Sequence, residues 1–488
     1  MQQLNRKSVK PQEILPIRIM QFGGGNFLRA FVDWMVQILN EETNFSAGIA
    51  VVKPTKRGNY KQLKTQDGLF TVILKGIKNG KLITDQKLIT CVQQVVNPYT
   101  DWQDYLDLAR NPNLRYIVSN TTEAGIAFSE SDIANHVPIE FPGKLTLWLY
   151  ERYLFFGTEA SRYGCVFLPC ELIEENGQAL RQCVLKYATH WELGEGFAQW
   201  IKESNHFCST LVDRIVSGYP SDSEDQLRAD LNYIDSLMVT GEYYHDWVIQ
   251  GPDFLVNELP SAKTDLNISF LDDLASYREM KVRILNGAHT AMVPIGYLCG
   301  FRTVKEVMDH PKLAAFIRAL LSDEVKKTLP STNFDVSAYI ADVLDRFRNP
   351  ALNHKLISIA LNSTTKFSTR LLPSLIDFNK YQGTLPRHIA FSLAALICFY
   401  KGDVDGDPIP LKDNDKVLLI FKEAWQAFNN KQIDSETLVF SLLGHTIVWG
   451  EDLTKIKGLA SLVAMDLTDI LNLGMIASIE KKTLYKQQ

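Results

Sequence analysis

The stretch Phe22-Gly-Gly-Gly-Asn-Phe-Leu-Arg-Ala30 joins a strand pattern to a helix pattern. The apolar run over residues 14–22 predicts a strand, and apolar residues recur at helical spacing over residues 27–39. Gly23 and Gly25 fit a G-x-G turn, in which the first glycine permits the tight bend and the second lets the backbone approach a pyrophosphate. The N–H groups at the start of the following helix would face the phosphates.

The third glycine of a full G-x-G-x-x-G pattern is missing, because Leu28 stands at its position. The turn alone is therefore a weak signal, and a flexible loop with three glycines is the alternative. A second strand over residues 47–52 would normally end in an Asp or Glu for the ribose hydroxyls. Lys53 follows it instead, with Lys56 and Arg57 close behind. These residues form either a solvated basic loop or a site for a 2′-phosphate, so NADP stays open beside NAD.

Strands at residues 116–119 and 165–168 continue the strand–helix order, which is typical of a parallel sheet with crossover helices. Residues 69–96 interrupt it, and Asn79-Gly80 within them is a hairpin signal. From about Ser276 onward, helical patterns dominate. We therefore predict an α/β, Rossmann-like N-terminal domain with an antiparallel insertion and a mostly α-helical C-terminal domain, over residues 1–275 and 276–488.

The chain of 488 residues has an ordinary apolar content of 46% and a net charge of −5 without a block of like charges. These values predict no nucleic-acid partner and no anionic membrane surface. The seven cysteines are odd in number and lack CxxC spacing, which argues against a disulfide framework or a cysteine zinc site. The longest apolar run, residues 389–400, is too short to span a bilayer and predicts a buried helix. We expect a cytoplasmic protein.

The segment Lys281-Val-Arg-Ile-Leu-Asn286-Gly-Ala-His289 carries groups suited to alcohol oxidation. Such chemistry needs a base for the hydroxyl proton and donors around the carbonyl oxygen. Asn286 and His289 share one face of an α-helix, but Lys281 lies roughly 140° from Asn286 on that helix. The spacing thus supports the Asn–His pair better than the triad, and a solvated lysine, a capping asparagine and a core histidine are the alternative.

The Lys281-x-x-x-x-Asn286-x-x-His289 spacing resembles the signature of the polyol-specific long-chain dehydrogenases, the mannitol dehydrogenase family. The glycine-rich turn is similar to that family's N-terminal motif. Further landmarks of the family follow in the same order: Ser119-Asn-Thr-Thr-Glu123, Val212-Asp-Arg-Ile215, Trp247-Val-Ile and Arg346-Phe-x-Asn349-Pro350. The resemblance covers most of the chain and becomes thin beyond Pro350.

Longer strings resemble the branch of the family that acts on sugar acids: Gln21 to Trp34, Ser119 to Ile126, Pro169 to Ile173, Phe207 to Val216 and Leu285 to Thr290. This resemblance implies NAD-dependent interconversion of D-altronate and D-tagaturonate in hexuronate breakdown, without a metal, by a monomer or small homo-oligomer. A fructuronate reductase or a mannitol-type polyol dehydrogenase is the alternative. A non-redox epimerase or sensor that binds a dinucleotide is the alternative from another class.

The same resemblance implies roles for individual residues. Lys281 would be the general acid/base, and His289 would orient the substrate. Asn286 would hold the substrate oxygen together with a second asparagine, for which Asn176 is the candidate. The cofactor would contact residues of the turn, the second strand and the Ser119 segment: Gly23, Gly24, Gly25, Asn26, Phe27, Arg29, Lys53, Thr122 and Glu123.

Two departures from the family pattern suit a sugar acid. Some members carry a Glu three residues before the lysine and others read Trp-Val-Ile-Glu, whereas this chain has Arg278 and Gln250. Both changes remove negative charge, so a substrate carboxylate is expected. Guanidinium groups bind carboxylates bidentately. We predict Arg346, with Lys366, as the carboxylate site, and expect the neighbouring Arg348 and Arg370 to be surface charges.

Overall fold

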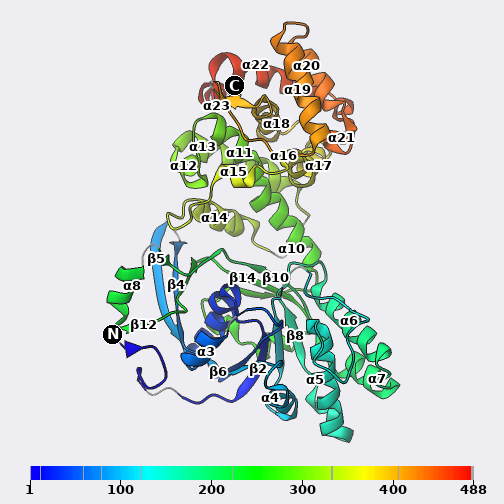
Figure 1. Cartoon of the computed structure of the whole chain (residues 1–488). Coiled ribbons are helices and arrows are strands. Elements are labelled where there is room, and N and C mark those ends of the chain that lie inside the picture. Colours follow the sequence, from blue (N-terminus) through cyan, green and yellow to red (C-terminus); the bar gives the residue numbers. More distant parts are fainter. Residues whose placement is uncertain are drawn as a thin grey trace. The chain divides into compact units, whose positions relative to one another are not determined.

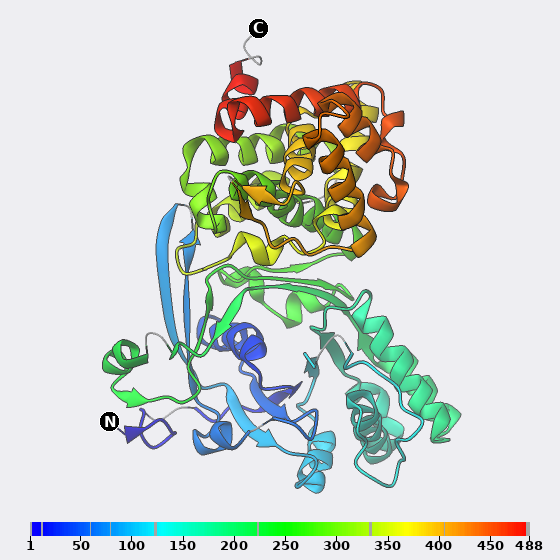
Figure 2. The same ribbon diagram turned by 45° about the horizontal axis from the view of Figure 1, so that its top comes forward.

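The computed structural model describes residues 2–10, 13–58, 60–78, 80–121, 124–221, 224–330, 334–404 and 406–484. The chain forms two compact units (Figures 1 and 2). Unit 1 comprises Met1–Gly76 and Leu82–Leu274, and unit 2 comprises Ile77–Lys81 and Ala275–Gln488.

Unit 1 is built on a six-stranded sheet of order β6-β3-β2-β7-β8-β9 in which every neighbouring pair is parallel. These strands are β6 (Val92–Val96), β3 (Gly48–Val52), β2 (Ile17–Phe22), β7 (Tyr116–Ser119), β8 (Val166–Pro169) and β9 (His206–Phe207). The predicted Rossmann-like fold is confirmed. The strand order reverses beside β2, and in such sheets ligands bind at the carboxyl ends next to this reversal.

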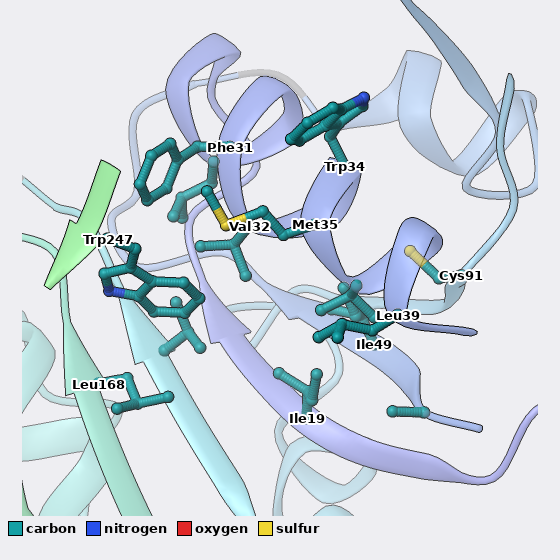
Figure 3. Packing of buried hydrophobic residues seen from close by; sticks show 14 of the residues in the cluster. Ile19, Phe31, Val32, Trp34, Met35, Leu39, Ile49, Cys91, Leu168 and Trp247 are labelled. Carbon is teal, nitrogen blue, oxygen red and sulfur yellow. The ribbon is translucent and has the colours of Figure 1, made fainter. Parts of the chain in front are cut away.

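Alternating side chains of β2 enter two hydrophobic cores, one on each face of the sheet. Ile19 packs beneath the helix that follows the turn, where Figure 3 shows it with Phe31 and Met35. Met20 and Phe22 belong to the other core, which is covered by α5 (Phe141–Phe156), α6 (Asn176–His190) and α7 (Glu195–Ser204). The apolar run of β2 therefore reflects burial on both faces, as expected for a central parallel strand.

The predicted insertion over residues 69–96 is too long. Strands β4 (Phe70–Lys78) and β5 (Lys81–Ile89) are neighbours in a separate sheet of order β11-β13-β4-β5, as the hairpin signal indicated. However, β6 belongs to the main sheet, where it pairs with β3 in parallel. A third sheet, of order β10-β14-β15, was not predicted: it contains β10 (Ser209–Asp213), β14 (Asp246–Gln250) and β15 (Ile268–Phe270).

Unit 2 is mainly helical, as predicted, and Figure 2 shows its helices in green to red. Its central helix α18 (Arg387–Phe399) packs against α11 (Gly287–Leu298) and α22 (Leu459–Leu473). Residues 389–399 of α18 are all buried, which confirms the predicted buried helix. Within the described part of the chain, no helix is both long and apolar enough to cross a membrane.

Candidate active site

The glycine-rich turn leaves the carboxyl end of β2 at the point where the strand order reverses. Gly23 has a φ of +120°, which favours glycine. A Cβ there would lie 3.1 Å from Leu28 Cδ1 and 3.2 Å from the carbonyl oxygen of Asn120, which follows the neighbouring strand β7. Gly23 is therefore required by the fold itself.

Gly25 is a different case. Its φ of −73° is accessible to any residue, and a Cβ there would meet no described atom within 4 Å. Gly25 caps a continuous helix made of α1 (Asn26–Leu28), the π-helix η1 (Arg29–Asp33) and α2 (Trp34–Glu42). The open space lies at a helix N-terminus, whose first N–H groups lack partners within the helix. This cradle fits the pyrophosphate of a dinucleotide.

We expect Gly25→Val to raise the Kd for NADH at least about tenfold, because the added side chain would occupy the pyrophosphate space. The melting temperature should stay within about 2 °C of wild type, because no protein atom is displaced. Gly23→Ala should instead lower the free energy of unfolding by about 1–3 kcal/mol. Fluorescence titration and thermal melts check both, and an unchanged Kd in Gly25→Val would place the cofactor elsewhere.

Other predicted cofactor residues lie around the turn. The Arg29 guanidinium donates to Asn26 Oδ1 (2.6 Å) and to the Leu237 carbonyl, so these two residues brace the turn from within. Lys53 directly follows β3, and its N–H donates to the Val96 carbonyl at 3.0 Å. Thr122 and Glu123 lie outside the described residues.

Glu171 was missed by the sequence analysis although it shapes this end of the sheet. Its buried carboxylate accepts hydrogen bonds from Ser119 Oγ, Thr121 N and Thr121 Oγ1, each at 3.0 Å. Burial raises the pKa of Glu171, and these hydrogen bonds oppose the increase. The segment after β7 is thereby fixed beside the glycine-rich turn. The position of an acidic residue directly after β8 was the sequence signal that could have identified Glu171.

Asn176 begins α6 and is fully buried. Its Nδ2 donates to the carbonyls of Pro169, Glu171 and Thr210, and its Oδ1 accepts from Thr210 N at 2.8 Å. Both polar atoms of the carboxamide are thus used by the backbone. These hydrogen bonds join the end of β8 to β10, and the contact of Asn176 with the substrate oxygen stays a prediction.

In unit 2, Lys281 ends α10 (Leu274–Lys281), and the π-helix η6 (Val282–Asn286) connects it to α11. Gly287 N donates to the Val282 carbonyl, five residues back, as in a π turn. Residues five apart in a π-helix are separated by little more than one turn, whereas in an α-helix they point in widely different directions. The wider turn therefore places Lys281 and Asn286 closer to one face of the helix than α-helical spacing would.

His289 lies one turn beyond Asn286, between two aromatic rings. Its ring centroid is 4.4 Å from that of Phe347 and 5.0 Å from that of His354. Phe347 ends α14 (Val336–Phe347), where Arg346 is also buried. Burial lowers the pKa of His354, and the charge of Arg346 lowers it further. Arg346, the predicted carboxylate-binding residue, therefore lies close to His354, whose imidazole packs against His289.

Helix α16 (Ser363–Arg370) packs against α11 and carries the basic residues Lys366 and Arg370. Arg370 Nη1 lies 3.4 Å from Thr290 Oγ1, which in turn donates to the Asn286 carbonyl at 2.9 Å. Lys366 is one turn earlier; burial lowers its pKa, and the charge of Arg370 lowers it further. Arg370 was expected to be a surface charge, but it is half-buried beside the Lys–Asn–His helix.

A parallel sheet whose glycine-rich turn has room for a pyrophosphate, and a helix that carries lysine, asparagine and histidine, are the arrangement expected of a dinucleotide-dependent oxidoreductase. Family models match both units: the mannitol dehydrogenase Rossmann domain over residues 17–263 and the mannitol dehydrogenase C-terminal domain over residues 273–471. The chain belongs to the mannitol dehydrogenase family and is an oxidoreductase that acts on CH–OH groups with a nicotinamide dinucleotide.

Curated relatives match over the full length. The altronate oxidoreductase of Yersinia enterocolitica is 46% identical over 98% of this chain and 99% of its own length. Those of Bacillus subtilis and Escherichia coli are 45% and 43% identical, over 99% and 97% of this chain and 98% of each relative.

Two solved structures share the fold. Substrate-free D-sorbitol dehydrogenase has a TM-score of 0.76 at 21% identity, with 95% of each chain covered. The ternary complex of Pseudomonas fluorescens mannitol 2-dehydrogenase with NAD and D-mannitol has a TM-score of 0.60 at 21% identity, with 100% of each chain covered.

Proposed function

We propose that the chain is an NAD-dependent oxidoreductase that interconverts D-altronate and D-tagaturonate in hexuronate breakdown. The observation that carries this proposal is the full-length similarity, at 43–46% identity, to relatives named altronate oxidoreductase. The basic residues around the Lys–Asn–His helix add support, because they suit a substrate with a carboxylate.

The proposed mechanism uses Lys281 as general acid/base. When bound, the nicotinamide gives or takes a hydride. Lys281 Nζ takes the hydroxyl proton during altronate oxidation and returns it to the oxygen during tagaturonate reduction. Asn286 donates a hydrogen bond to that oxygen and stabilises its developing negative charge. His289, packed between Phe347 and His354, orients the substrate. These steps require no metal.

The substrate carboxylate is proposed to bind among Arg346, Lys366 and Arg370. Lys366 Nζ donates to the Ile359 carbonyl at 2.7 Å, which fixes the ammonium beside Arg370 and leaves further donors available. Burial lowers the pKa of Arg370, so a bound carboxylate would compensate a partly desolvated charge. A neutral polyol would offer no such compensation.

NADH oxidation followed by absorbance tests the proposal. We expect kcat/KM for D-tagaturonate to exceed that for D-fructuronate and for the neutral ketose D-fructose by at least about 10²-fold. NADH should be preferred to NADPH. Equal or greater activity with D-fructuronate or D-fructose would instead favour the corresponding alternative enzyme. Binding of NADH without its oxidation by any hexuronate would favour a non-redox epimerase or sensor.

A further inference from the structure

Tyr60 packs against the middle glycine of the glycine-rich turn. It stands between β3 and α3 (Lys61–Thr65) in the chain, and its hydroxyl oxygen accepts a hydrogen bond from Gly24 N at 2.9 Å. A Cβ on Gly24 would lie 3.0 Å from Tyr60 Cε1 and 3.2 Å from Val51 Cγ1. The turn therefore needs its middle glycine for the contact with Tyr60, although the G-x-G pattern leaves that position free.

The proton of the Tyr60 hydroxyl is available to a ligand. A phenol can accept hydrogen bonds and donates one. Since the Gly24 N–H can only donate, it uses the oxygen of Tyr60 and leaves the proton free. The contact with Gly24 is the one hydrogen bond of this hydroxyl within the described part of the chain. Burial raises the pKa of Tyr60, and the Gly24 N–H and the charge of Arg29 oppose the increase, so the phenol keeps its proton at neutral pH.

The surroundings of this hydroxyl suit an anion. The charge of Arg29 acts on Tyr60, and Lys53 and Lys56 stand on the same loop after β3. There is also room on the side that faces Gly58, whose φ is +88°. A Cβ on Gly58 would meet only Tyr60 Cε2 among the described atoms, at 3.8 Å, and the tyrosine itself is only partly buried. An anionic oxygen beside the hydroxyl would therefore gain a donor in positively charged surroundings.

We propose that Tyr60 is a cofactor-binding residue, whose hydroxyl accepts from Gly24 N and donates its proton to a pyrophosphate oxygen of NAD. Gly24 is next to Gly25, where the open space for the pyrophosphate lies. A hydroxyl that accepts one hydrogen bond becomes a stronger donor of another. A hydrogen bond to an ionised oxygen is also about twice as strong as one between neutral groups. The inference rests on the proposed binding of NAD at this turn.

The adenosine ribose is the other part of the dinucleotide expected near the end of β3. Its hydroxyls are neutral, so they would not use the positive charge around Tyr60. The ribose is also expected at the residue that directly follows the strand, which is Lys53, whereas Tyr60 is bonded to the turn that faces the phosphates. The pyrophosphate is thus the better acceptor, and the Tyr60 O–H replaces the Gly24 N–H that it covers as a donor to it.

Tyr60→Phe tests the donor, because it keeps the ring against Gly24 and removes the hydroxyl. By isothermal titration calorimetry on the full chain, Kd should rise at least about tenfold for NADH and for ADP, which both carry a pyrophosphate. Kd for adenosine should change by less than about twofold, because adenosine has no phosphate.

Tyr105→Phe is the matched control. The Tyr105 hydroxyl, on α4 (Trp102–Asp107) of the same unit, donates to the Lys144 carbonyl at 2.9 Å. Its loss should lower the melting temperature and leave all three Kd values unchanged. In Tyr60→Phe, an unchanged Kd for NADH or an equal loss for adenosine would overturn the inference, because the hydroxyl would then bind nothing or bind the ribose.

Replacement of Tyr60 by 3,5-difluorotyrosine separates donation to the phosphate from support of Gly24. Its phenol is more acidic than that of tyrosine, and the phenolate still accepts from Gly24 N but has no proton to donate. From about pH 6 to about pH 9, Kd for NADH should therefore rise at least about fivefold more than in the wild type, whose phenol titrates above about pH 10. A ratio of the two Kd values that does not change with pH would overturn the inference alone. Failure of the wild type to bind either NADH or ADP would contradict the proposed cofactor as well.

Discussion

Replacing Lys281 with methionine is expected to lower kcat for tagaturonate reduction by about 10²–10⁴-fold, the usual contribution of a positioned general acid/base. Methionine retains much of the length of the lysine side chain and removes only its ability to transfer a proton. The Kd for NADH should therefore stay within about twofold of wild type, because the cofactor cradle is formed by other residues. Single-turnover oxidation of NADH measures the chemical step directly.

Lys305→Met serves as the control, because the partly exposed Lys305 forms an ion pair with Asp309 within α12 (Val304–Asp309). Its kcat should not change. A second variant, Lys281→Ala, leaves space for a small primary amine, and added ethylamine should restore part of the lost rate. Rescue of this kind requires proton transfer at that position. Loss of activity that appears only in KM, or that no amine restores, would count against Lys281 as the acid/base.

The sequence could predict the parallel sheet because its signals are local. The apolar run of β2 and the glycines after it depend on neighbouring residues and on burial of both sheet faces. The sheet of β10, β14 and β15 was missed for the opposite reason. Its strands are short, and β10 and β14 pair across a long stretch of chain, Ser209 with Gln250 and Asp213 with Asp246. Such register depends on tertiary contacts.

The position of Lys281 relative to Asn286 could not be predicted from their spacing in the sequence, because that prediction assumes an α-helix. The π-helix η6 alters the position of Lys281 relative to Asn286, and no residue pattern announces it. The contacts around η6 give a physical reason why this π-helix keeps its geometry. Arg283 within η6 forms ion pairs with Glu279 and Asp377, both at 2.7 Å, and Gly287 permits close approach to Leu371.

Single polar residues were the least predictable part of the site. Asn176 and Arg370 each have hydrogen-bond partners distant in sequence, which the sequence alone did not indicate. Asn176 meets Thr210 through two hydrogen bonds, and Arg370 meets Thr290. Neither Thr210 nor Thr290 carried a signal of its own. Composition and periodicity locate elements, whereas the availability of a polar group depends on all of its neighbours.

Arg370→Met is expected to lower kcat/KM for D-tagaturonate by about 10²-fold, because a charge-assisted contact to the carboxylate is lost. The neutral analogue D-tagatose carries a hydroxymethyl group in place of the carboxylate, so its weaker turnover should change by less than about threefold. The measurement is therefore the ratio of kcat/KM for D-tagaturonate to kcat/KM for D-tagatose. Arg370→Lys should fall between wild type and Arg370→Met, because lysine keeps the charge without the bidentate geometry.

Arg348→Met is the matched control for this comparison. Arg348 is partly buried and lies in the same unit, where it lines a separate surface cavity of about 690 Å³ with Arg318, Asp309 and Asp323. Its replacement should leave both substrates unaffected. An equal loss on tagaturonate and tagatose in Arg370→Met would mean that Arg370 only supports the helix through Thr290. An unchanged ratio with full activity would assign the carboxylate to Arg346, since the charge of that arginine acts on His354, which packs against His289.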